Sequence, residues 1–280
     1  MKAIHVDATT LPDAWFQTVY KCLEYGNIFK IDRGSYAGDK RLEFDYITIQ
    51  IKSPDKGDLI PHLPAHYNLP DPVELEYILS GTDKNGITYE RGYVEYLMSG
   101  EVQERESYTY GERLNNNRLM HGQTSRWNQK QLQGIYYQDK EMWDNKQIIL
   151  NNNGADFLSQ IELVIWTYKK RGHRNNQMCL QVAKPEDMLL QDPPCLRHID
   201  TRIQDDTLHF FPYFRSWDLW GGLPANLAGI ELLKQYMASE IGVKNGQIIA
   251  ASKGLHLYSY VWELAEILRG RTIEEFKTGI

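Results

Sequence analysis

The 280-residue chain lacks the features that mark membrane, secreted and nucleic-acid-binding proteins. It has no run of 18 apolar residues, so neither a transmembrane helix nor a membrane partner is predicted. The N-terminus lacks the basic-then-apolar layout of a secretory signal. Lysine and arginine total 31 against 37 aspartates and glutamates, and the net charge of −6 disfavours binding to DNA. We therefore expect a globular, cytoplasmic protein.

Cysteine is scarce, and its three copies are far apart in the sequence. Cys22, Cys179 and Cys195 form no Cys-x-x-Cys pair, so neither a disulfide framework nor a zinc site is predicted. A glycine-rich dinucleotide fingerprint is also absent, and nothing indicates a metal or a flavin. Cys22 falls in a predicted amphipathic helix and Cys179 in the apolar stretch 178–180, so both are expected to be buried. Only Cys195 has polar chemistry around it.

The order of predicted elements indicates one α/β or α+β domain over residues 1–280. Apolar spacing predicts helices over 13–24, 158–171, 226–241 and 254–268. Shorter helices that end at glycines are expected over 74–81 and 93–100, and strands over 178–182, 199–203 and 208–214. Within 42–51 the apolar alternation slips by one residue, which indicates a β-bulge or a change of face. Irregular connections are expected over 53–72, and loops with exposed helix over 115–156.

One segment gathers most of the chemically versatile side chains. It begins with Pro193-Pro194-Cys195, continues with Arg215-Ser216-Trp217-Asp218 and Gly222-Leu223-Pro224-Ala225-Asn226, and ends with His256-Leu257-Tyr258. A thiol, a guanidinium, a hydroxyl, a carboxylate, a carboxamide and a His/Tyr pair thus occur in a fixed order. Such a set can attack an electron-poor ring, bind a phosphate and read a base edge and a sugar.

This segment, residues 184–258, resembles the thymidylate synthase family. Pro194-Cys195 matches the family's nucleophile motif, and His256-Leu257-Tyr258 matches its sugar motif. Residues 215–226 match its Arg-Ser-x-Asp…Gly-Leu-Pro-x-Asn motif. Patchier matches are Asp32-Arg33-Gly34-Ser35, Tyr110-Gly111-Glu112-Arg113 and Lys184-Pro185-Glu186-Asp187-Met188. The spacing and the short tail resemble the compact, archaeal-type members.

The resemblance implies a mixed, bulged β-sheet that is flanked by helices and dimerises through the sheet. It implies reductive methylation of dUMP to dTMP, with 5,10-methylene-tetrahydrofolate or a related methylene-tetrahydropterin as the donor of carbon and hydride. The implied partners are dUMP, the reduced folate and a second copy of the chain. The implied catalytic residues are Cys195, Arg215, Asp218 and Tyr110. The implied substrate-binding residues are Arg33, Arg174, Ser216, Gly222, Asn226, His256 and Tyr258.

Chemistry gives Cys195 and Arg215 complementary roles. A thiolate can add to C6 of a uracil ring and turn C5 into a nucleophile, which splits one difficult step into two. A free cysteine has a pKa near ~8.5 and needs a nearby cation to ionise at neutral pH. Arg215 is the best candidate in the sequence, and it can also contact the nucleotide phosphate. The resemblance implies that a second phosphate arginine comes from the neighbouring subunit, for which Arg174 is the candidate.

The base and the sugar also have candidate partners. The carboxamide of Asn226 offers a donor and an acceptor, which match O4 and N3–H of uracil, whereas an aspartate would accept from the amino group of cytosine. Asn226 is also a good helix N-cap. In the family picture Asp218 orients the pterin, although it could equally be a turn residue. His256 and Tyr258 alternate on an extended segment, so both can face one sugar hydroxyl.

Some positions depart from the family pattern and leave alternatives open. Leu196 replaces the histidine after the nucleophile, and Phe214 replaces the glutamine before Arg-Ser. The glutamate that organises proton transfer has three candidates, Glu74, Glu76 and Glu95. The short tail keeps hydroxymethylation of a dCMP or dUMP substrate open, since exclusion of water decides that outcome. A non-catalytic nucleotide-binding paralogue is a third alternative, which has no need for Cys195.

Overall fold

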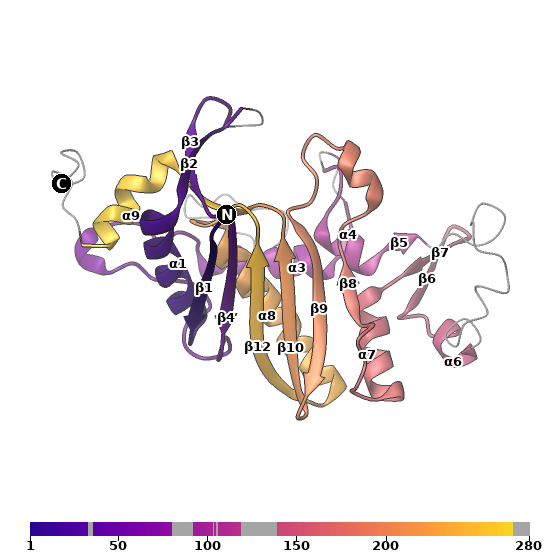
Figure 1. The fold of residues 1–280 in the computed structure, drawn as a ribbon. Coiled ribbons are helices and arrows are strands. Elements are labelled where there is room, and N and C mark those ends of the chain that lie inside the picture. Colours follow the sequence, from indigo (N-terminus) through magenta and orange to yellow (C-terminus); the bar gives the residue numbers. More distant parts are fainter. Residues whose placement is uncertain (33–35, 80–91, 103, 105, 119–138, 271–280) are drawn as a thin grey trace.

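A six-stranded mixed sheet forms the centre of the computed structural model of this chain (Figure 1). The structure describes residues 1–32, 36–79, 92–102, 104, 106–118 and 139–270. In spatial order the strands are β1 (Ala3–Ala8), β4 (Tyr46–Ile51), β12 (Lys244–Ser252), β10 (Thr207–Phe214), β9 (Leu196–Gln204) and β8 (Cys179–Gln181). β1 is parallel to β4 and β10 to β12, the other neighbours are antiparallel, and β10 shifts register against both neighbours. The predicted mixed, bulged sheet is confirmed.

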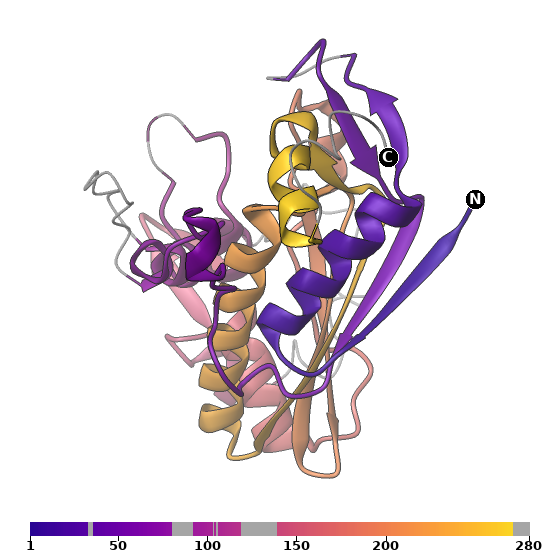
Figure 2. The ribbon, with the colours of Figure 1, turned by 90° about the vertical axis from the view of Figure 1, so that its left-hand side faces the viewer.

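Helices cover one face of this sheet, where every second side chain of each strand is buried. α1 (Leu11–Tyr25) packs on β1 and β4, and α8 (Gly222–Ile241) packs on β10 and β12. α7 (Gln160–Arg171) lies against α8, and α9 (Trp262–Leu268) lies against α1. Figure 1 looks onto the opposite face of the sheet, and Figure 2 shows the helices gathered on one side. The predicted flanking of the sheet by helices is therefore confirmed for one face.

A second sheet lies beside the first and has the order β11 (Trp217–Asp218), β13 (Leu255–Tyr258), β3 (Lys40–Glu43) and β2 (Asn27–Lys30). The chain passes from β3 into β4 through the buried Phe44. The backbone of Phe44 pairs with Leu255 and Gly254, with N···O distances of 3.0 and 3.2 Å. The slip in apolar alternation at this point is therefore a change of face, because the chain moves from one sheet to the other.

Shorter elements complete the described chain. They are η1 (Ala65–Tyr67), α2 (Leu75–Leu79), α3 (Tyr93–Met98), α4 (Tyr110–Asn115), β5 (Asn117–Arg118), α6 (Lys140–Trp143), β6 (Ile149–Asn152), β7 (Ala155–Leu158), η2 (Pro185–Leu189) and η3 (Ser259–Val261). β5, β7 and β6 form a small sheet where loops and exposed helix are predicted. Asn153 and Gly154, both with positive φ, close its hairpin, so an Asn-Gly turn was the signal in the sequence. No helix of the described residues is long and apolar enough to cross a membrane.

Three further expectations need correction. The helix predicted over 254–268 is a strand up to Tyr258, because β13 pairs on both sides, and only α9 is an α-helix. α8 begins at Gly222 rather than Asn226, because Asp218 satisfies the first backbone amides of the helix. Cys179 is only half-buried, because β8 is an edge strand, whereas Cys22 is buried as expected.

Candidate active site

Cys195 lies directly before β9, in a loop that three elements hold in place. Its carbonyl accepts a hydrogen bond from the backbone N–H of Arg215, at 2.8 Å, where β10 ends. The next residue, Leu196, donates its backbone N–H to the hydroxyl of Tyr110 on α4, at 3.2 Å. Tyr110 therefore fixes the backbone beside the thiol. On the same helix, Arg113 pairs with the buried Asp187 of η2 at 2.8 Å and anchors the segment that leads to Cys195.

The guanidinium of Arg215 wraps around the Pro-Pro-Cys loop. Its Nε donates to the carbonyls of Pro193 and Pro194, each at 3.2 Å. Its Nη2 pairs with the exposed carboxylate of Asp192 at 3.0 Å and also donates to Pro193. Arg215 thus shapes the loop that carries the nucleophile as well as bringing positive charge to it.

The environment of Cys195 acts on its thiol in opposing directions. Burial, the largest effect, raises the pKa of Cys195, and the carboxylate of Asp192 raises it further. Arg215 and Arg197 lower the pKa. Arg215 therefore acts in the direction expected of an activator, but burial outweighs it and the net shift is upward. Arg215 is thus the nearby cation that the sequence indicates, but its effect does not bring the pKa of Cys195 below the ordinary value.

His256 and Tyr258 lie together on β13, as their spacing predicts, with ring centroids 4.7 Å apart. Nδ1 of His256 is 2.8 Å from the carbonyl of Gly254, and since a carbonyl only accepts, Nδ1 carries the proton. Nε2 is buried and has no hydrogen-bond partner among the described residues. Burial lowers the pKa of His256, so Nε2 is an acceptor at neutral pH. A hydroxyl group of a ligand would satisfy it.

Asn226 lies in the second turn of α8, inside the helix and not at its cap, which is Gly221. The N-cap interpretation of Asn226 is therefore wrong. Its Oδ1 accepts from Nε1 of Trp217 at 2.8 Å, and its Nδ2 donates to the hydroxyl of Tyr93. The capping function belongs to Asp218, whose carboxylate accepts from the backbone amides of Gly221 and Gly222 at 3.0 and 2.8 Å.

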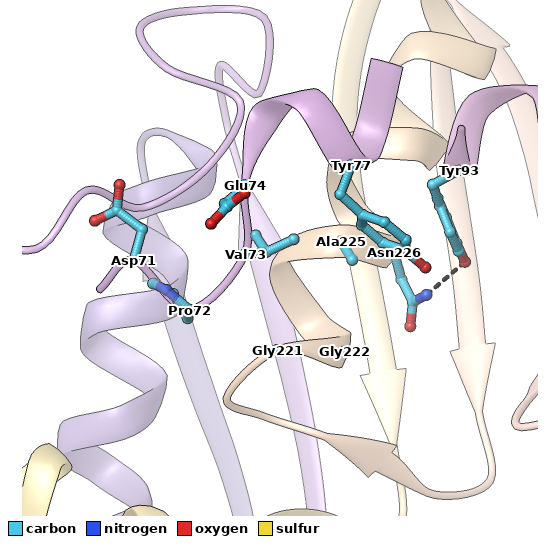
Figure 3. Close-up of a pocket in the computed structure, with 10 residues that line it drawn as sticks. All are labelled: Asp71, Pro72, Val73, Glu74, Tyr77, Tyr93, Gly221, Gly222, Ala225 and Asn226. Carbon is cyan, nitrogen blue, oxygen red and sulfur yellow. Dashed lines mark hydrogen bonds between the residues drawn. The ribbon is translucent and has the colours of Figure 1, made fainter. Parts of the chain in front are cut away.

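A pocket of 420 Å³ opens beside Asn226 (Figure 3). Its lining comes from the connection before α2, from α2 and α3, and from the start of α8: Asp71, Pro72, Val73, Glu74, Tyr77, Tyr93, Gly221, Gly222, Ala225 and Asn226. Of the three candidate glutamates, Glu74 lines this pocket, whereas Glu76 and Glu95 are exposed on α2 and α3. Its lining combines two tyrosine rings with the carboxylates of Asp71 and Glu74.

A second, more polar pocket borders the arginine motif. Arg41, Arg215 and Lys253 surround it together with Ser216. The carboxylates of Glu43 and Asp45 and the N-terminus at Met1 also line it. Sequence reasoning missed Arg41 and Lys253. Arg41 lies opposite Tyr258 in the pairing of β3 with β13, so the signal was long-range strand pairing, which local patterns do not reveal.

Known proteins resemble this chain over much of its length. The pattern of the thymidylate synthase family matches residues 102–278. The chain belongs to the thymidylate synthase family. It is 27% identical over 266 residues to a protein of Methanosarcina barkeri named "putative thymidylate synthase". The matched stretch covers 95% of this chain and 94% of the relative. A protein of Methanococcoides burtonii with the same name is 26% identical over 268 residues. The thymidylate synthase of Listeria monocytogenes is 27% identical over 130 residues, or 46% of this chain and 39% of the relative.

Membership of the thymidylate synthase family agrees with the expected resemblance to archaeal members and with the mixed α/β fold. One expected site residue lies far from the others. The exposed Arg174 follows α7, and its neighbour His173 pairs with Asp206 in the turn between β9 and β10. Cys195 lies at the opposite end of β9, a span of ~30 Å at the rise of a β-strand. Arg33 lies outside the described residues.

Proposed function

We propose that the chain is a thymidylate synthase, which converts dUMP to dTMP with a methylene-carrying reduced folate or pterin. The observation that carries this proposal is the position of residues 215–218. Arg215 bonds to the backbone of Cys195, Trp217 bonds to Asn226, and Asp218 pairs with His256 on β13. One short stretch therefore contacts the thiol segment, the carboxamide and the strand that carries the imidazole. A uridylate needs these groups for attack, base reading and sugar binding.

Each residue then has a role that its surroundings support. The Cys195 thiolate adds to C6 of uracil, and the electron pair moves to O4, so that C5 becomes nucleophilic. Arg215 and Ser216 bind the phosphate, and Arg33 joins them by its sequence motif. Nε2 of His256 accepts from a sugar hydroxyl, to which Tyr258 also bonds. Tyr110 keeps the thiol segment in place.

The pterin is expected in the pocket that Glu74, Tyr77 and Asn226 line (Figure 3). When bound, a methylene-tetrahydropterin supplies a carbon and a hydride and leaves as the dihydropterin. The family resemblance implies that Asp218, on β11 four residues before α8, would orient the ring. Gly222 leaves room for the side chain of Asp218, since a Cβ at 222 would come within 3.1 Å of the Cβ of Asp218. We propose Glu74 as the glutamate that organises proton transfer, because it lines the pocket with Asn226.

A covalent trap tests the chemistry. The protein is incubated with 5-fluoro-dUMP, with and without methylene-tetrahydrofolate, and its mass is measured before and after digestion. A ternary adduct on Cys195 supports the synthase, and the Cys195→Ser variant forms none. No adduct under any condition would overturn the enzymatic proposal and favour a nucleotide-binding paralogue. Tritium release from C5 of dUMP, compared with dCMP, identifies the base, and the product mass separates methylation from hydroxymethylation.

We also propose that a second copy of the chain covers the open face of the central sheet. Along β10 this face carries Phe211 and Tyr213, large aromatic side chains that alternate with the buried ones. A symmetric partner would bury these aromatic side chains and bring its own Arg174 to the phosphate. Within one chain, Arg174 lies too far from Cys195 to reach a phosphate bound there. A cytoplasmic location stays a prediction from the sequence.

A further inference from the structure

The carboxamide of Asn226 is held from two sides before any base is present. Nε1 of Trp217 donates to Oδ1 at 2.8 Å, and the hydroxyl of Tyr93 accepts from Nδ2. A carboxamide has a second lone pair on the oxygen and a second hydrogen on the nitrogen. Asn226 therefore keeps one acceptor and one donor site for a ligand, and its neighbours decide on which side each lies.

Both neighbours are themselves firmly placed. Trp217 is 2% exposed, and its ring stacks on that of Phe214 with centroids 3.9 Å apart and an interplanar angle of 6°. Its backbone N–H donates to Gly254 at 3.2 Å. Tyr93 packs its ring on α8 at Gly229, where a Cβ would come within 2.5 Å of the ring. A side chain at 229 would therefore displace the ring that brings the Tyr93 hydroxyl to Asn226.

The two neighbours differ in the hydrogen bonds that they can form: one can only donate, and the other can donate or accept. An indole N–H only donates, so Trp217 requires the carboxamide oxygen to face it. A tyrosine hydroxyl donates or accepts, so Tyr93 tolerates either end of the carboxamide. If the Asn226 carboxamide turned over, its NH₂ group would meet the Trp217 N–H, and a buried donor would lose its acceptor. Trp217 alone therefore sets the orientation.

The orientation matters because it selects the base. Uracil presents O4 as an acceptor and N3–H as a donor, whereas cytosine presents a donor amino group and an acceptor at N3. A carboxamide that matches one edge matches the other only after it turns over. We propose that Trp217 is the positioning residue that restricts Asn226 to uracil, an inference that rests on the proposed binding of dUMP.

The test compares how tightly the two nucleotides bind. Trp217→Phe keeps an aromatic ring against Phe214 but removes the N–H. Dissociation constants for dUMP and dCMP are measured by calorimetry, without a folate. In the unmodified protein dUMP binds more tightly; in Trp217→Phe the preference for dUMP shrinks about 10- to 100-fold, the range expected when an unsatisfied buried donor no longer penalises the reversed carboxamide. An unchanged ratio of the two constants would overturn the inference.

Tyr93→Phe is the matched control, because it removes the other partner of the same carboxamide. Tyr93→Phe weakens the binding of both nucleotides and keeps the ratio of their dissociation constants. A merely structural role of Trp217 would make the two variants behave alike. If Trp217→Phe does not fold, benzothienylalanine at position 217 replaces the N–H by sulfur in the same ring shape, and the same shift in ratio is expected. An unmodified protein that binds neither nucleotide would refute the proposed function instead.

Discussion

At the scale of single residues, Arg215 combines two tasks that are usually separate. Its guanidinium donates to the carbonyls of Pro193 and Pro194, so it holds the loop of the nucleophile. Its charge also opposes the effect of burial on the pKa of Cys195. A residue so placed links the shape of the loop to the reactivity of the thiol, and neither property should change without the other.

Substitution of Arg215 should change how the reactivity of Cys195 depends on pH. Only the thiolate is alkylated, and since Arg215 lowers the pKa of Cys195, Arg215→Ala should move the midpoint of alkylation to higher pH. The affinity for dUMP should fall about tenfold or more with the lost charged hydrogen bonds. Iodoacetamide labelling of the Cys195 peptide, followed by mass spectrometry from pH 6 to 10, measures the midpoint.

Asp192→Asn provides a control of opposite sign. The exposed carboxylate of Asp192 raises the pKa of Cys195, so its removal should move the midpoint to lower pH. If both variants moved the midpoint in the same direction, the change would come from a disturbed loop and not from charge.

At the scale of elements, α4 and η2 form the support of the nucleophile. The Arg113 and Asp187 side chains that join them are 8% and 2% exposed. Asp187 also accepts from the backbone N–H of Lys184 at 2.7 Å, which closes the first turn of η2. Since α4 also carries Tyr110, this joint sets where the start of β9 lies relative to the helix.

Removal of one partner of this joint should destabilise the fold strongly. Asp187→Ala removes the buried partner of the Arg113 charge and leaves only the more exposed Glu112 beside it, so the free energy of unfolding should fall by about 3 kcal/mol. Glu112→Ala removes the more exposed neighbour of Arg113, and its effect should stay below about 1 kcal/mol. Urea denaturation followed by tryptophan fluorescence measures both; similar losses in the two variants would contradict the assigned importance of Asp187.

At the scale of the whole molecule, the open face of the sheet is the feature to test. If a second copy covers it, the protein sediments at twice its 32.7 kDa mass. Phe211→Asp, in the middle of β10, should convert it to a monomer, whereas Tyr236→Asp on the helix side should not. Analytical ultracentrifugation measures the mass of the unmodified protein and of both variants. An unmodified protein that is monomeric at all concentrations would refute the proposed dimer.

Mixed dimers test the proposed donation of Arg174. The Cys195→Ser and Arg174→Ala variants should each be inactive, or reduced by at least about 100-fold. After the two are mixed and allowed to exchange subunits, activity should return, because one site of each mixed dimer has both residues. A mixture that exchanges subunits but stays inactive would show that Arg174 acts within its own subunit, and a fully active Arg174→Ala variant would show that Arg174 has no role.

The sequence predicts most reliably the helices and strands whose structure depends on their own residues. α1 and β10 follow from the spacing of their apolar residues, and α7 ends at the predicted Gly172. The helix predicted over 254–268 wrongly took in β13, although His256 and Tyr258 were expected on an extended segment. The pattern of β13 is short, and its partners β3 and β11 lie elsewhere in the sequence. The start of α8 could not be read locally, since a side chain four residues earlier, that of Asp218, sets it.

In the candidate site too, local motifs could be predicted, whereas contacts between distant residues could not. The arginine motif that the sequence singles out lies beside Cys195 through Arg215 and beside β13 through Asp218. The contact of Trp217 with Asn226 was beyond prediction, since it depends on the direction of an indole that strand pairing and the Phe214 ring fix. The same holds for Glu74, whose choice among three glutamates needed the pocket itself.

The bonds that hold Asn226 and His256 have a thermodynamic consequence. Trp217 and Tyr93 fix the carboxamide, and the Gly254 carbonyl fixes the imidazole, so neither side chain has to give up rotational freedom when a nucleotide arrives. Immobilising a side chain at a binding site commonly costs about 0.5–1.5 kcal/mol, and here folding has already met that cost. Base and sugar recognition should therefore carry little entropic penalty from these two side chains.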